Sequence, residues 1–393
     1  MKKKDSIEIV DVFVLHEWYY KIGGVWPLKR DYIKFGMFVV YSLINIIAAY
    51  IDTIAVFGNL HLMVENLLET LVITMSLFMV LVVYFHPSLS ELITTVKNEI
   101  AKEDYQTNEE RSLYYAYNRI AYGLSKVAMT SSVITVMAMY MKPLPSVVHA
   151  LYKSLGNNGT PVDADVLVIP FKGMAVLNIT DIRIYFVLYV YRLPCVYLGI
   201  CHTLTICFIL SLVLHICGKL SIIKQRVQMF DTSSKNKLDT AIRHHVQIHL
   251  QLIDMVKLIE DIFQYILLLD LVQTSVRLGL SSYVALTSKD AGSEFLAMCT
   301  FASYASLLFV LLYVYCFVGE YLTQESKDLT EAYYQCNWQE MPLSCKSSLL
   351  ICMISSQTHL NFTAGKFYKF SLYGFTGIVK TSMAYLSMLR TVI

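Results

Sequence analysis

The sequence predicts an all-α, polytopic membrane protein with seven transmembrane helices. Of its 393 residues, 56% are hydrophobic and 16% are charged, and the apolar residues gather in long runs. Soluble chains carry roughly 25% charged residues. This chain therefore has more apolar surface than a soluble domain can cover.

Seven apolar segments have the length that a bilayer crossing needs, about 20 residues. They lie at 33–57, 60–85, 121–141, 184–220, 258–286, 295–318 and 370–389. Pro87 ends the second segment and Pro143 ends the third, because proline removes a backbone donor. The fourth segment is too long for one perpendicular crossing and contains Pro194, which predicts a tilted or kinked helix.

Lysine and arginine in the connections predict the orientation, because cytosolic connections carry the excess of these residues. With a cytosolic N-terminus, the inside connections hold 21 of them and the outside connections hold 6. The C-terminus then lies outside, as does the loop 142–183. Its sequons at Asn158 and Asn178 predict glycosylation, whereas Asn361 falls inside and should stay bare.

The same reasoning divides the chain into five parts. Residues 1–222 form the first four helices with the extracellular loop 142–183, and residues 258–318 form helices five and six. Residues 223–257 have apolar residues at helical spacing, which predicts a cytosolic extension of the fifth helix. Residues 319–366 form a cytosolic anchor segment, and residues 367–393 form the last helix.

Several function classes are disfavoured. A net charge of +2 gives no reason to expect a nucleic-acid partner. A Gly-rich phosphate loop, a nucleophile elbow and a carboxylate pair are missing from the sequence, so we expect neither an enzyme nor a cofactor. His245 and His249 have a spacing that can hold zinc, but a solvated helix face explains them better, and we expect no metal site.

Charges inside the apolar segments need a partner or water, because a charge is costly at mid-bilayer. Asp270 and Arg277 lie two turns apart on one helix face and can share a network, with a structural role between helices as the alternative. The other charges of this kind include Glu65, Glu69 and Arg192.

The chain ends inside an apolar helix, so we expect this helix itself to carry function, as the wall of a pore. From Ala332 to the end, the sequence resembles the insect odorant receptor family. The residues that carry the resemblance are Tyr334, Cys336 and Trp338, Gln357, Gly365-Lys366-Phe367, Ser371-Leu372, Phe375 and Tyr385.

The resemblance implies an odorant-binding tuning subunit of a ligand-gated cation channel. Such a subunit assembles with the odorant receptor coreceptor in a heterotetramer, in the plasma membrane of an olfactory neuron dendrite or cilium. The anchor segment, with Tyr334 and Trp338, would be where subunits pack. The alternatives are a gustatory-receptor-like homotetramer and, less favoured, a G-protein-coupled receptor, whose N-terminus would lie outside.

Two sets of residues follow as candidate sites. The resemblance places an odorant pocket among the second, third, fourth and sixth helices, whose outer halves offer Ser131, Thr135, Tyr185, Tyr189, Phe301 and Tyr304. The last helix presents one stripe at helical spacing, in which the resemblance makes Met388 and Val392 gate-like. The full pore-lining stripe is Thr381, Tyr385, Met388, Thr391 and Val392.

Overall fold

The computed structural model describes residues 12–102, 104–145, 147–148, 152, 169–171, 182–230, 235–287 and 294–392. Helices dominate these residues. They are α1 (Val14–Ile22), α2 (Tyr32–Ala55), α3 (Leu60–Phe85), α4 (Pro87–Lys102), α5 (Asn108–Met141), α7 (Ile182–Tyr191), α8 (Leu193–Gln228), α9 (Lys235–Thr287), α10 (Glu294–Gln335), α11 (Leu343–Ser356) and α12 (Leu372–Val392), with a 3-10 turn η2 (Trp338–Glu340) before α11.

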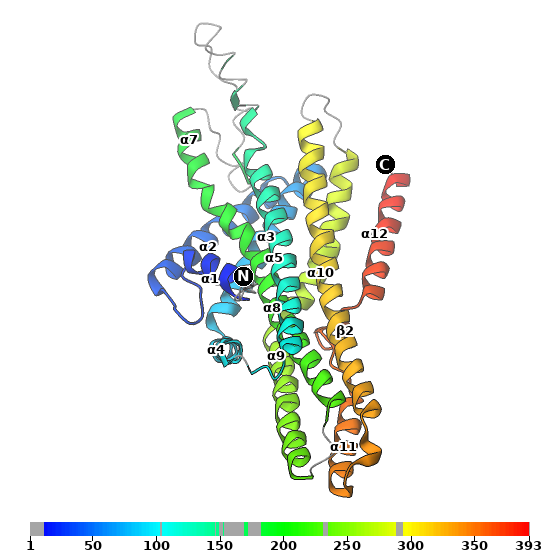
Figure 1. Ribbon diagram of the computed structural model, residues 1–393. Coiled ribbons are helices and arrows are strands. Elements are labelled where there is room, and N and C mark those ends of the chain that lie inside the picture. The colour runs from blue at the N-terminus through cyan, green and yellow to red at the C-terminus, as the bar shows by residue number, and fades with distance from the viewer. Residues whose placement is uncertain are drawn as a thin grey trace, which may run out of the picture.

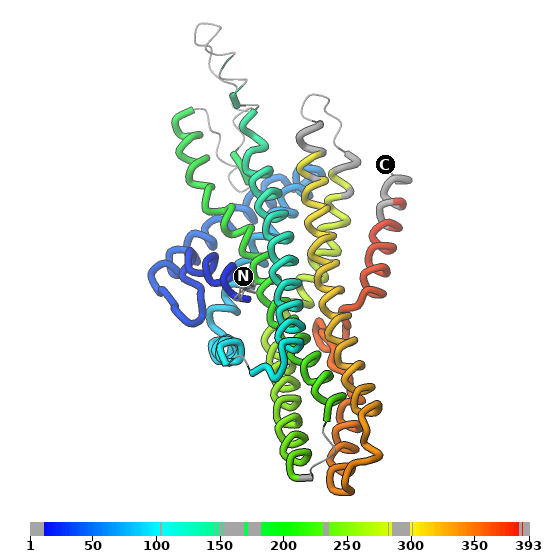
Figure 2. The backbone as a smooth tube through the Cα atoms, viewed as in Figure 1, coloured from blue at the N-terminus to red at the C-terminus, as the bar shows by residue number. Residues whose placement is uncertain are grey.

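The long helices α5, α8, α9 and α10 run side by side along the molecule (Figure 1). The N-terminal helices α1, α2 and α4 lie on one side of this bundle, and α12 stands on the other (Figure 2). The start of α9 and the hairpin of α10 and α11 form the end of the bundle opposite α7 (Figure 1).

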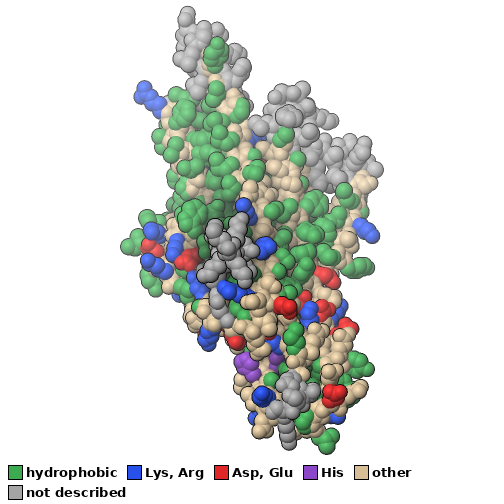
Figure 3. Space-filling view, viewed as in Figure 1, with side chains coloured by type: hydrophobic (Ala, Val, Ile, Leu, Met, Phe, Trp, Pro, Cys, Tyr) green, Lys and Arg blue, Asp and Glu red, His purple; other side chains and the backbone are tan. Residues whose placement is uncertain are grey.

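Helices occupy all seven predicted spans. Five segments of the described chain are long and apolar enough to cross a membrane, at Tyr32–Ala55, Leu60–Phe85, Asn108–Met141, Ile182–Gln228 and Ala302–Gln335. The other two predicted spans lie in α9 and α12, whose mean hydropathy is lower because charges such as Asp270, Arg277 and Lys380 interrupt them. Hydrophobic side chains gather on the upper half of the molecule in Figure 3, above most of the charged ones. The chain is thus an all-α, polytopic membrane protein, as the sequence predicts.

The fourth span is broken where Pro194 predicts a kink. Helix α7 ends at Tyr191, and α8 begins at Leu193 with Pro194 in its first turn, where a missing N–H costs nothing. Helix α8 is the centre of the fold, since it contacts α1, α3, α5, α7, α9 and α10. Of the most apolar stretch of this span, 94% is buried.

A buried ion pair joins α8 to α5 at the end of the bundle predicted to be cytosolic. Arg226 donates from Nε and Nη2 to the two carboxylate oxygens of Glu110, at 3.0 and 2.9 Å. Its Nη2 also donates to the Asp104 carbonyl at 2.8 Å. A bidentate ion pair of this kind fixes the relative position of the two helices.

A short hairpin connects the anchor segment to α12. Strands β1 (Thr363–Ala364) and β2 (Tyr368–Lys369) pair antiparallel, with Thr363 opposite Lys369. In the turn, Gly365 has φ +61° and Lys366 has φ +63°, a region that favours glycine. A Cβ at Gly365 would also come within 2.9 Å of Leu268 on α9. The Gly-Lys-Phe sequence therefore forms a turn that docks against α9.

The described part of helix α12 has little cover within the subunit, although Phe375 and Ile378 pack partly against the core. Its described side chains, at 372–384 and 387, are all exposed or half-buried. Thr381 is exposed, and the side chains of Tyr385, Met388, Thr391 and Val392 lie outside those that the structure describes. The helix is held at its start, where Phe370 is buried.

The anchor segment exposes large apolar side chains. Leu343, Leu350, Ile351 and Ile354 of α11 are between 56% and 83% exposed. Tyr334 is 72% exposed, whereas Trp338 is half-buried against the core. An apolar face of this kind marks an interaction surface.

The prediction of a solvated face for His245 and His249 is wrong. Both histidines are buried, at 3% and 8% exposure, and lie against the Tyr333 ring of α10. Burial lowers the pKa of His245 to about 3. This part of α9 packs against α10 and α11 of the same subunit, so the histidines face the core.

Candidate functional site

A cavity of about 100 Å³ lies inside the bundle, among α3, α5, α8 and α10. These helices contain the second, third, fourth and sixth predicted spans, which are those that the family resemblance implies. Ala49 of α2 and Arg277 of α9 also line it. A dry cavity of about 150 Å³ accepts benzene, so this cavity is on the scale of a small organic ligand.

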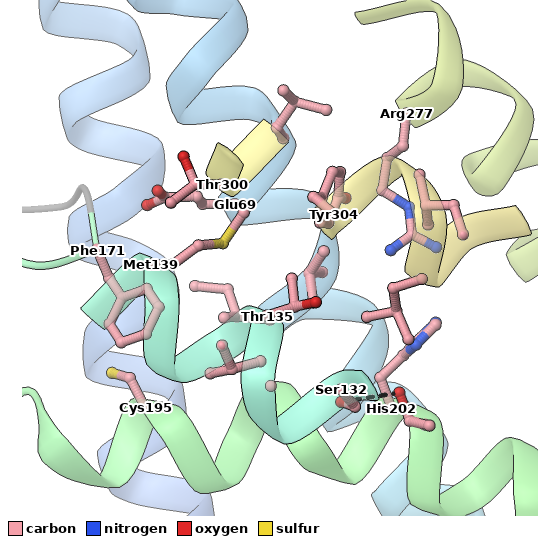
Figure 4. A pocket seen from close by; sticks show the side chains of 18 of the residues that line it. Glu69, Ser132, Thr135, Met139, Phe171, Cys195, His202, Arg277, Thr300 and Tyr304 are labelled. Carbon is pink, nitrogen blue, oxygen red and sulfur yellow. Dashed lines mark hydrogen bonds between the residues drawn. The ribbon is translucent and has the colours of Figure 1, made fainter. Parts of the chain in front are cut away.

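The wall is mostly apolar, with polar groups at a few points. Figure 4 shows Phe171 and Cys195 at one end, Arg277 and His202 at the other, and Thr135 between them. The apolar part of the wall includes Leu68, Val72, Ile73, Val136, Met139, Leu307, Leu308 and Leu311. This is the usual composition of a small-molecule site.

Hydroxyl groups join the helices around the cavity. Thr203 of α8 donates to Ser132 of α5 at 3.1 Å. Thr135 donates to the carbonyl of Ser303 on α10 at 3.3 Å. These hydrogen bonds hold the helices of the wall in place. Each hydroxyl oxygen can still accept a hydrogen bond from a ligand.

A buried polar network begins at the cavity and leads away from it. His202 lies with Nε2 2.6 Å from Oδ1 of Asp270, and Arg277 lies 3.4 Å from the same oxygen. Tyr315 of α10 donates to Oδ2 of Asp270 at 3.1 Å. His202 and Arg277 line the cavity, whereas Asp270 and Tyr315 lie behind it. The predicted network of Asp270 and Arg277 is thus present, and it also joins α8 and α10.

The network ends at the start of α12. The Tyr315 ring stacks on Phe370, with ring centroids 5.1 Å apart. Phe370 comes two residues before α12, and its carbonyl lies against Gly319 of α10, where a Cβ would approach it to 2.4 Å. A continuous set of contacts therefore connects the cavity to the helix predicted to line the pore.

The structure separates the predicted pocket residues. Thr135 and Tyr304 line the cavity, whereas Ser131 does not, and its neighbour Ser132 does. Tyr185 and Tyr189 lie outside the cavity. Tyr189 instead exchanges two hydrogen bonds with Tyr140, each hydroxyl donating to the other residue's carbonyl, at 2.9 and 3.0 Å.

Some of the other predicted site residues are not among those that the structure describes. The side chain of Phe301 is not among the described ones, and neither sequon asparagine of the outer loop, Asn158 or Asn178, is a described residue. Asn361 is described and half-buried, and its amide donates to the His359 carbonyl at 2.8 Å.

Sequence reasoning missed the charged and polar part of the wall. Glu65, Glu69, Arg192 and Arg277 line the cavity, and His202 joins them. The four charges were recognisable as costly inside apolar spans. Their convergence on one cavity follows only from how the helices are rotated.

Comparison with known proteins identifies the family. A family model described as "7tm Odorant receptor" matches residues 59–383. The chain belongs to this odorant receptor family. Odorant receptor 13a of Drosophila melanogaster is 28% identical over 193 residues, which cover 45% of this chain and 46% of that protein. The odorant receptor coreceptor of Ooceraea biroi is 27% identical over 150 residues, which cover 38% of this chain and 31% of that protein.

These alignments span less than half the length of the relatives. A solved structure covers more of the chain. The insect olfactory receptor OR5 from Machilis hrabei, in complex with eugenol, has a TM-score of 0.77 and 13% identity, with 98% of this chain and 100% of that chain covered. At this identity the likeness establishes an odorant receptor fold.

Proposed function

We propose that this chain is the odorant-binding subunit of a ligand-gated, non-selective cation channel. In this proposal it assembles with the odorant receptor coreceptor as a heterotetramer in the plasma membrane of an olfactory neuron dendrite or cilium. The observation that carries the proposal is the cavity inside the bundle, which is joined by a buried network to the start of α12.

Ligand binding is supported by the shape and chemistry of the cavity. Thr135 and Tyr304 present polar atoms beside the apolar part of the wall. Such a wall suits a small volatile molecule with one or two oxygen atoms. The solved relative was determined with eugenol, a small molecule of that kind.

Gating requires that the ligand prefer one of two states of the channel. A ligand in the cavity would contact its wall, which includes His202 and Arg277. Both residues hold Asp270, and Asp270 holds Tyr315 against the base of α12. A shift of this network on binding would move the start of the pore helix.

Assembly is supported by two exposed surfaces. Helix α12 has little cover from its own subunit, and α11 exposes an apolar face that includes Leu343 and Ile351. Packing around a central axis would cover both surfaces. With Met388 and Val392 at this axis, apolar constrictions would close the pore by dewetting.

The proposal is tested by expressing the chain with and without a coreceptor and recording whole-cell currents during a panel of volatiles. A current that requires both chains supports it. Surface expression of both chains without any evoked current would contradict it.

A further inference from the structure

Arg192 stands at the break between α7 and α8 and lines the cavity. The residue is 1% exposed. Its Nη1 donates to Oδ1 of Asn45 on α2 at 2.8 Å. Within the described part of the chain, its Nε and Nη2 are buried and have no hydrogen-bond partner. One side of the guanidinium is therefore satisfied and the other is not.

The other two cations of the cavity wall have carboxylate partners. Lys142 lies 3.6 Å from Glu65, and Arg277 lies 3.4 Å from Asp270. Arg192 has a neutral amide partner instead. A buried charge without an opposite charge is costly, and an anion that arrives beside it recovers much of that cost.

The two unsatisfied nitrogens have a shape that selects the anion. Nε and Nη2 form one edge of the planar guanidinium, with two N–H groups pointing the same way. This edge matches the two oxygens of a carboxylate, which accept one hydrogen bond each. A neutral carbonyl has one oxygen and no charge, so it satisfies the edge less well.

We propose that the cavity recognises a small monocarboxylic acid, bound as its carboxylate on the Nε–Nη2 edge of Arg192. The inference rests on the proposed function and names the ligand class. The apolar tail would lie along the leucines of α10, such as Leu307 and Leu308. Both nitrogens are covered by neighbours, so the acid reaches them as the wall opens.

The rest of the cavity limits the ligand further. At about 100 Å³, the cavity favours a short chain. Glu69 lies near Thr300 on the same cavity wall (Figure 4). A second carboxylate on the ligand would meet this negative charge, so a diacid is disfavoured.

The test uses the full chain expressed with a coreceptor, and whole-cell currents evoked by butanoic acid, methyl butanoate and 1-butanol at neutral pH. We expect the acid to be the most potent of the three. Arg192→Gln should lower the potency of the acid about tenfold to a hundredfold, the range expected for charged hydrogen bonds. It should change the potency of the neutral compounds less than threefold. Arg183→Gln, which removes an exposed arginine of α7, is the matched control.

Two further measurements keep the proposal testable if Arg192→Gln fails to reach the surface. Arg192→Lys keeps the charge but loses the bidentate edge of the guanidinium. The potency of the acid should therefore fall less than in Arg192→Gln. Asn45→Asp places a carboxylate beside Arg192, so it should weaken the acid response while surface biotinylation stays normal.

Equal potency of acid and ester, or equal effects of Arg192→Gln and Arg183→Gln, would overturn the carboxylate assignment. A chain that responds to neutral volatiles but not to acids would refute only this inference. A chain at the surface that responds to no volatile would refute the proposed function as well.

Discussion

The ring of Tyr315 stacks on that of Phe370, with their planes 15° apart, while the Tyr315 hydroxyl donates to Asp270. One side chain thus touches both the polar network behind the cavity and the base of α12. This position makes Tyr315 the contact through which a ligand in the cavity would act on the last helix.

Tyr315→Phe removes the hydroxyl but keeps the stacked ring. Phe370→Leu removes the ring on which Tyr315 stacks but leaves the Tyr315 hydroxyl in place. Each should reduce the maximal agonist-evoked current. Because the two changes act on the same set of contacts, the double variant should lose less of the response than the two single losses added together. Full dose-response curves should give a coupling energy between the two residues of about 0.5–2 kcal/mol. Tyr313→Phe, on a tyrosine 41% exposed on the same helix, is the control. Strictly additive losses would show that Tyr315 and Phe370 act separately.

Tyr304→Ala should weaken agonist potency by about 1–3 kcal/mol, because it removes a large contact surface from the cavity wall. Tyr185→Phe should leave potency unchanged, because Tyr185 is buried outside the cavity. Dose-response curves at matched surface expression measure both effects. If Tyr185→Phe shifted the potency ranking and Tyr304→Ala did not, the agonist site would lie elsewhere.

The free energy of unfolding should fall as the pH drops below about 6.5, and buried His245 should contribute to this loss. Burial depresses the pKa of this histidine to about 3, so the unfolded chain binds a proton that the folded chain refuses between these values. Its contribution is complete above about pH 6.5 and is lost at up to about 1.4 kcal/mol per pH unit on acidification. Thermal unfolding in detergent from pH 7.5 to 5 should show a smaller slope for His245→Gln.

The control for this measurement is His244→Gln, since the side chain of His244 is 53% exposed. This variant controls for the removal of a histidine at a neighbouring, exposed position. Identical slopes for wild type and His245→Gln would mean that folding does not lower the pKa of His245.

The predicted topology places the outer loop outside the cell, where its sequons should be glycosylated, and places Asn361 inside, where it should not be. Removing Asn158 and Asn178 together by mutation to Gln should abolish any shift on a gel after glycosidase treatment. Asn361→Gln should leave the shift unchanged. A shift that survives the double change and disappears with Asn361→Gln would reverse the orientation.

Cysteine substitutions test the pore-lining stripe of α12. Met388→Cys and Val392→Cys should react with a small extracellular thiol reagent in an agonist-dependent way and change conductance. Leu386→Cys, on the opposite face by helical spacing, and Leu389→Cys, at the edge of the stripe, should react less. Equal reactivity on both faces would exclude this stripe from the pore.

Much of the fold was predictable because bilayer length, proline and charge act locally. The seven spans, the break at Pro194 and the partnership of Asp270 with Arg277 all follow from such signals. The cavity wall was not predictable to the same degree, because it depends on how each helix is rotated. A rotation of one residue exchanges Ser131 for Ser132, and packing of Tyr189 on Tyr140 removes it from the cavity. Arg192 was recognisable as a costly charge, but not as part of a site.

The most direct measurement of the central claim is the whole-cell current evoked by a volatile panel in cells that express this chain with a coreceptor. We expect a cation current that needs both chains, begins without a G-protein step, and loses potency with Tyr304→Ala. Recordings from cells that express this chain alone test the homotetrameric alternative. A response that a G-protein inhibitor abolishes, or normal surface expression without any evoked current, would contradict an odorant-gated channel of both chains.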